Sequence, residues 1–231
     1  MRDDVIRDNI AAMTTLRRYL HEPMNTLTHL LGAAVSVAGL LILVVLTWGD
    51  WPRLATMVVY GLSMIFLFTA SSLMHGVKTS PRYHFWLNRL DHAAIFLLIA
   101  GTYTPIAYNL FPSPWNWLIL LGVWTAVLIG VFYKTTSKQI HGFLNVSIYV
   151  ILGWGAALPL FLATTMFDLI PWQGVLWLLA GGLIYSFGFL IYYRRWPDPW
   201  PDTFGHHEIW HLFVMGGCLF HYLFILLYVA L

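Results

Sequence analysis

Two histidines near the C-terminus are spaced to share one face of a helix. His207 and His211 are four residues apart, so in a helix they lie about 6 Å apart along the axis. Two imidazoles placed in this way can bind one zinc ion. The same spacing separates Ser71 from His75, so a hydroxyl lies one turn from a third imidazole. If His75 is the third ligand, three histidines and one open position form the pattern of a catalytic zinc site.

A carboxylate completes this predicted site. Asp91 begins an apolar segment that we assign below to a membrane span, and we expect it at the same depth in the membrane as His75. There the Asp91 carboxylate can hold and deprotonate a metal-bound water. The Ser71 hydroxyl can orient that water or a substrate carbonyl. We therefore predict that His75, His207 and His211 bind the metal and that Asp91 and Ser71 are catalytic.

The segment His207-Glu208-x-x-His211 also matches a zinc protease signature, in which the glutamate is the general base. Glu208 follows His207 by one residue, about 100° around a helix, so its carboxylate need not face the metal. An activity that depends on Asp91 and not on Glu208 would favour the first interpretation. The reverse result would favour a membrane metalloprotease.

Three further histidines lie in or beside apolar segments. A lone histidine in a membrane helix is more often a hydrogen-bonded packing residue than a metal ligand. We therefore expect packing roles for His29, His92 and His221, and the sequence predicts no role for Glu22 or Asn25.

The chain that positions these residues has the composition of a membrane protein. Of its 231 residues, 59% are hydrophobic and 10% are charged, whereas typical soluble domains have about 25% charged residues. This composition excludes a disordered chain, a fibrous repeat and an ordinary cytosolic enzyme. The net charge is only +2 and the basic residues are scattered, which argues against nucleic-acid binding.

Long stretches without charge predict an all-α bundle of seven transmembrane helices. One stretch is long enough for two spans and is divided near Pro112 and Pro114. We expect residues 1–23 to form a cytoplasmic or interfacial amphipathic segment and residues 24–231 to form one transmembrane domain. The expected spans are 25–48, 54–76, 91–109, 115–133, 141–163, 170–193 and 207–230.

The basic residues predict how this bundle is oriented. Eleven of the twelve Lys and Arg residues fall on one side of the topology, and Arg53 alone falls on the other. Cytoplasmic loops carry the excess of Lys and Arg, so the N-terminus is predicted to be cytoplasmic and the C-terminus external. The polar residues that could form a site then all lie at cytoplasmic helix ends: Glu22, Asn25, His29, Ser71, His75, Asp91, His207 and His211. Their shared depth predicts one site in the inner leaflet.

These motifs together resemble the hemolysin III family, the bacterial branch of the progestin and adiponectin receptor family. The resemblance runs from Glu22 to the C-terminus. It implies seven helices with a cytoplasmic N-terminus and zinc bound near a catalytic serine and aspartate. In this family the residue after the first histidine of the last helix need not be glutamate, which weakens the protease interpretation. The motifs are Glu22-x-x-Asn25-x-x-x-His29, Ser71-x-x-x-His75, Asp91 followed by Ala100-Gly101-Thr102-Tyr103-Thr104-Pro105, and His207-x-x-x-His211 with a later His221.

The resemblance also implies a function. The family is similar to alkaline ceramidases and is linked to membrane homeostasis, so we expect a zinc-dependent hydrolase of the bacterial plasma membrane that cleaves a lipid amide or ester. Zinc would lower the pKa of its bound water, Asp91 would take the proton, and hydroxide would attack the carbonyl. The hemolysin label of the family leaves open a pore-forming, cytolytic or receptor-like protein with structural zinc. No single span has a repeated polar face, so a pore would require a homo-oligomer.

Overall fold

The structure is a computed structural model that describes residues 14–137, 149, 151–155, 169–200 and 203–231. Within this part the chain is helical and has no β-strand, and six helices are long and apolar enough to cross a membrane. The all-helical prediction is thereby confirmed, whereas most of the predicted span 141–163 lies outside the described residues. The helices are α2 (Pro23–Leu46), α3 (Trp51–Gly76), α4 (Pro81–Leu110), α5 (Trp115–Thr136), α8 (Trp172–Arg194) and α9 (His206–Ile225), which continues as the π-helical turn η1 (Leu226–Ala230).

Short local signals define where these helices begin. Pro23 and Pro81 are the first residues of α2 and α4, a position where the missing N–H of proline costs nothing. Asp50 precedes α3, and its carboxylate accepts a hydrogen bond of 3.2 Å from the backbone N–H of Arg53. The segment 14–19, from the predicted interfacial region, is also helical.

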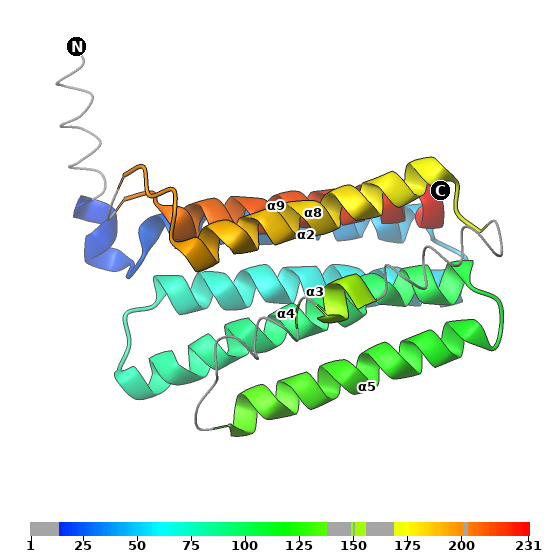
Figure 1. The fold of residues 1–231 in the computed structure, drawn as a ribbon, viewed down its shortest axis with the longest axis horizontal. Helices are drawn as coiled ribbons and strands as arrows, with labels where there is room; N and C mark the ends of the chain where they lie inside the picture. Colours follow the sequence, from blue (N-terminus) through cyan, green and yellow to red (C-terminus); the bar gives the residue numbers. More distant parts are fainter. Residues whose placement is uncertain (1–13, 138–148, 150, 156–168, 201–202) are drawn as a thin grey trace, which may run out of the picture.

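The helices lie side by side, with their axes running in roughly the same direction along the length of the molecule (Figure 1). Helix α3 packs against α2 and α4, and α2 also contacts α9. Helix α5 packs on α4, and α8 packs on α9. In its most apolar stretch, 61% of α4 is buried but only 11% of α5. The central helices α3 and α4 thus carry polar residues inside the protein, while α5 and α8 present apolar side chains outward.

Close packing of α3 on α4 depends on Gly101. A Cβ atom at this position would lie 2.0 Å from the Ser63 Oγ atom, so only a residue without a side chain allows the observed approach. This contact lies along the same interface that brings Ser71 of α3 toward Asp91 of α4.

The spans expected from the sequence leave Arg82, Arg89 and Lys134 in the loops between helices, and this prediction was wrong. Helix α4 begins at Pro81, ten residues before the expected start of its span, so Arg82 and Arg89 are helical. Lys134 lies within α5. The first turns of α4 are polar, so the length of the apolar stretch alone does not indicate where this helix begins. All three residues remain at the same end of the bundle, so the predicted orientation does not depend on the error.

Candidate metal centre

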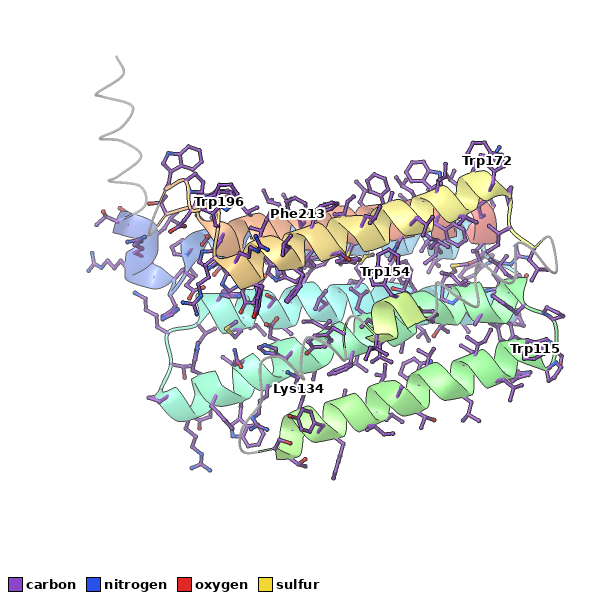
Figure 2. All side chains as sticks on the ribbon, viewed as in Figure 1. Trp115, Lys134, Trp154, Trp172, Trp196 and Phe213 are labelled. Atoms are coloured by element: carbon purple, nitrogen blue, oxygen red, sulfur yellow. The ribbon has the colours of Figure 1, made fainter. Side chains whose placement is uncertain are left out.

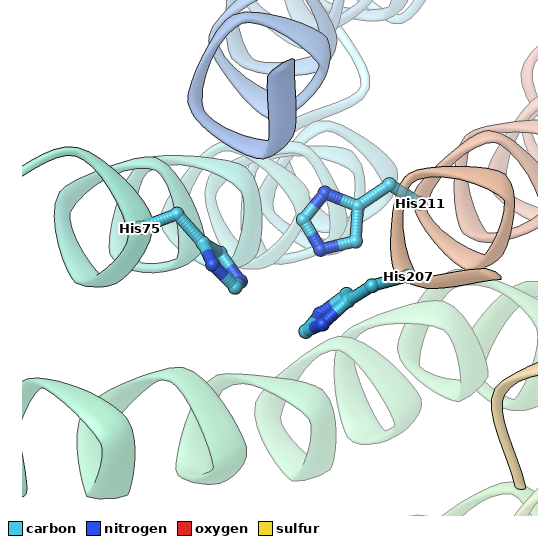
Figure 3. A group of neighbouring side chains, drawn as sticks. All are labelled: His75, His207 and His211. Carbon is cyan, nitrogen blue, oxygen red and sulfur yellow. The ribbon is translucent and has the colours of Figure 1, made fainter. Parts of the chain in front are cut away.

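The end of α3 and the start of α9 bring three histidines together. His75 is the second-to-last residue of α3, and His207 and His211 lie in the first two turns of α9. One nitrogen atom of each ring lies within 4.8 Å of the other two, and Figure 3 shows the rings directed toward one another. His75 and His211 are buried and His207 is partly buried. The cluster can therefore hold a metal ion, as the spacing predicts.

The geometry of the three rings fits a three-nitrogen site. Their centroids form a nearly equilateral triangle, with sides of 4.9, 4.9 and 5.0 Å. Zinc–nitrogen bonds of about 2.0–2.1 Å in a tetrahedral site place the nitrogen atoms about 3.3 Å apart. The observed nitrogen separations, at most 4.8 Å, are larger than this value, so the rings would have to approach one another on binding. Imidazole also suits copper, iron and nickel, so the ligands alone do not select zinc.

The first turn of α2 orients His75. The Oε2 atom of Glu22 lies 2.5 Å from Nδ1 of His75, and Asn25 donates a hydrogen bond of 2.9 Å to the same oxygen. The backbone adds a second link, since the N–H of Glu22 donates to the carbonyl of His75 at 2.8 Å. Because the Glu22 carboxylate holds Nδ1 of His75, Nε2 is the ring nitrogen available to bind a metal. A carboxylate on the second ring nitrogen is common in metal-binding histidines.

The Glu22 carboxylate precedes the membrane-spanning part of α2. Hydrogen bonding with His75 lowers the pKa of Glu22 to about 2, against the opposing effect of partial burial. Glu22 is therefore ionised at neutral pH and acts as the acceptor for the imidazole N–H.

The next turn of α2 contacts His211. The Thr28 hydroxyl lies 3.3 Å from Nδ1 of His211, and the His29 ring stacks on the His211 ring at a centroid distance of 3.6 Å and an angle of 12°. His29 also packs edge-on against Phe68. Sequence reasoning missed Thr28 and left Glu22 without a role. The signal available for Glu22 was its depth, which matches that of the histidines.

The two predicted catalytic residues lie beside the cluster. Ser71 is 2% exposed, one turn before His75 on α3. Ser71 and His75 of α3 both lie close enough to Asp91 of α4 to interact with it electrostatically. The structure thus brings both residues to the site, while their catalytic roles stay predictions.

Glu208, His92 and His221 have hydrogen-bond partners, whereas neither ring nitrogen of His29 has one among the described residues. The Oε2 atom of Glu208 accepts a hydrogen bond of 2.8 Å from the backbone N–H of Gly205, so this carboxylate caps α9. Nδ1 of His92 lies 2.7 Å from the carbonyl oxygen of Asn88, which matches its predicted packing role. His221 likewise contacts a backbone carbonyl, whereas His29 packs mainly by ring stacking.

A cavity of about 330 Å³ opens at the outer side of the histidine cluster. Glu22 connects the two, because its carboxylate lines the cavity and also contacts His75. The polar character of the lining suits water and polar groups. The lining residues are Arg17, His21, Glu22, Pro23, Met24, Lys78, Thr203 and Glu208.

Comparison with known proteins shows similarity along nearly the whole chain. A family model described as Haemolysin-III related matches residues 17–222. Hemolysin-3 of Bacillus cereus is 33% identical over 220 residues, which cover 94% of this chain and 96% of the relative. The Hemolysin-3 homolog of Bacillus subtilis is 29% identical over 90% of this chain and 93% of its own length. Heptahelical transmembrane protein 5 of Arabidopsis thaliana is 28% identical over 68% of this chain and 46% of its own length.

Proposed function

The chain belongs to the hemolysin III family and is a multi-pass integral membrane protein, and on this premise we propose that it is a zinc-dependent hydrolase of a membrane lipid amide or ester. The observation that carries the proposal is the convergence of His75, His207 and His211 on one point beside Asp91. Three histidines with an open fourth position suit a catalytic zinc ion better than a structural one, which is usually closed by a fourth protein ligand.

The proposed chemistry divides between the ion and the protein. When bound, zinc would polarise the carbonyl group of the substrate and lower the pKa of the water bound to the ion. Asp91 would accept the proton of the attacking water and then donate it to the leaving group. Ser71 would orient the water or the substrate carbonyl through the hydroxyl that it presents beside Asp91. The site lies at helix ends, where the amide or ester of a lipid can reach it from the side.

We place this site on the cytoplasmic side of a bacterial plasma membrane. The excess of Lys and Arg at this end of the bundle supports the orientation, and two of the relatives come from Bacillus. A seventh span in 141–163 is supported by the apolar sequence and by the name of the heptahelical plant relative.

A metalloprotease is less well supported. Its general base would be Glu208, and that carboxylate caps the N-terminus of α9 instead of facing the cluster. A pore-forming protein with structural zinc is the second candidate, because two relatives carry the name Hemolysin-3.

Replacement of Asp91 by Asn tests the hydrolase. We expect turnover of a fluorescent lipid amide or ester to fall by roughly 100-fold or more, since general-base catalysis contributes about 10²–10⁴-fold. Bound zinc, measured by elemental analysis, should stay equal to wild type. Glu208→Gln is the matched control and should keep its turnover. Equal turnover in Asp91→Asn and wild type would contradict the mechanism.

Dye release from liposomes separates the second candidate. If the protein is a hydrolase without pore activity, dye-loaded liposomes that contain it should release no more dye than liposomes without protein. This should hold with or without a chelator. Release by the purified protein that persists in Asp91→Asn would favour the pore.

A further inference from the structure

A second buried polar cluster lies where α4 meets the end of α5. Lys134, in the last turn of α5, is fully buried, and Arg89 in α4 is 4% exposed. Figure 2 labels Lys134 at the end of α5, on the side that faces α4. A lysine near the end of a membrane helix normally extends to the headgroups, because its ammonium group stays hydrated there. Lys134 is instead enclosed within the protein.

The contacts of these two side chains leave hydrogen-bond donors unused. Arg89 donates to the backbone carbonyls of Lys134 and Ser137, and its guanidinium carbon lies 4.3 Å from the centre of the Phe85 ring. The Nζ atom of Lys134 lies 5.4 Å from the centre of the Tyr149 ring. Among the described residues, neither Nζ of Lys134 nor Nε of Arg89 has a hydrogen-bond partner. The cluster therefore offers donors to a further group.

In the part of the chain that the structure describes, no carboxylate forms an ion pair with Arg89 or Lys134. The sequence has no acidic residue between Asp91 and Asp168. Asp91 is two residues from Arg89, about 200° around α4, so the two side chains leave the helix on different faces. The helix carbonyls that Arg89 contacts carry only partial charge. Because buried charge is costly unless it is paired, the two cations call for an anion from outside the chain.

We propose that Arg89 and Lys134 bind a phosphate group, and that the phosphate of a membrane lipid headgroup occupies this site. The cluster lies near helix ends, at the depth where headgroups are found. Phosphate presents several acceptor oxygens around a negative charge, which matches the three donors of Lys134 and the unused N–H of Arg89. The outward face of α5, where Leu128 and Phe132 are 60% and 68% exposed, offers an apolar surface to the acyl chains.

Thermal unfolding of the full-length protein, delipidated in a neutral detergent, tests the proposal. At saturation, phosphatidylglycerol should raise the unfolding temperature of the wild type by roughly 5 °C. Dioleoylglycerol, which has acyl chains but no phosphate, should leave it unchanged. Inorganic phosphate distinguishes the source: no shift supports a lipid occupant, and a shift as large as that with phosphatidylglycerol overturns the lipid in favour of soluble phosphate.

Two substitutions make the test specific to this cluster. Lys134→Met should abolish the shift, whereas Arg82→Met, which removes an exposed cation from the same end of α4, should keep it. If Lys134→Met does not fold, Lys134→Arg should fold and keep the shift, because it retains the charge and donors. The proposal is overturned if the wild type responds to no phosphate compound, or if Lys134→Met or Lys134→Arg behaves contrary to these expectations.

Discussion

Two buried polar clusters lie at the same end of the bundle, and they differ in whether carboxylates accompany their basic side chains. In the metal centre, the carboxylates of Glu22 and Asp91 lie next to the three imidazoles. In the second cluster, Arg89 and Lys134 have no carboxylate partner among the described residues. The metal centre is thus prepared by the protein for a cation, whereas the second cluster is prepared for an anion. The two proposed sites therefore place opposite charge preferences at one end of the same bundle.

The largest expected effect comes from removing a metal ligand. His211→Ala should lower metal affinity by more than about 100-fold, because loss of a direct ligand exceeds the 10–100-fold cost of losing an outer partner. Competition with a chelating dye measures the affinity. His84→Ala, at the same end but outside the cluster, should bind like the wild type. If His211→Ala binds metal as tightly as the wild type, the three-histidine cluster is not a metal site and the contrast with the Arg89–Lys134 cluster fails.

The next effect concerns the contribution of α2. Glu22→Gln keeps the shape of the side chain but removes the charge that holds His75, so metal affinity should fall by about 10–100-fold. The same competition assay applies. Glu208→Gln is the matched control, since its carboxylate caps a helix close by. An equal loss in both variants would show a general effect of charge instead of orientation through His75.

A smaller effect tests the close packing of α3 on α4. Gly101→Ala should destabilise the fold by about 1–3 kcal/mol, because the new Cβ would meet Ser63. Gly122→Ala has open space around its Cβ position and should be neutral or stabilising by up to about 1 kcal/mol. Unfolding in denaturant measures both. Similar stability of the two variants would mean that α3 and α4 can separate without cost.

The smallest effect is a pH dependence of the metal-free protein. The pKa of Glu22 is about 2 in the folded protein, below its usual value of 4.5. Its stabilising contribution is complete above pH 4.5 and is lost as the pH falls toward 2. Because the side chain is 40% exposed, we expect only about 1 kcal/mol. Glu22→Gln should remove this part of the acid dependence, which a comparison of unfolding free energies at pH 5 and pH 3 would reveal.

The sequence predicted the proximity of the three histidines better than it predicted their surroundings. Histidine spacing and shared depth were sufficient for His75, His207 and His211, because both depend only on helix geometry. The contacts of Glu22 and Thr28 could not be derived, since they require the lateral arrangement of α2, α3 and α9. The burial of Lys134 was missed because a uniformly apolar helix has no polar stripe to indicate which side faces the protein.

The metal centre joins two parts of the chain that are synthesised far apart in time. His207 follows His75 by 132 residues, and the last helix contributes two of the three imidazoles. Since membrane helices enter the bilayer in order, an ion can be fully bound only after the final helix has docked. If the cluster binds a metal as proposed, metal loading would report completed assembly, and a chain truncated before α9 would have the carboxylates and one histidine but no complete cluster.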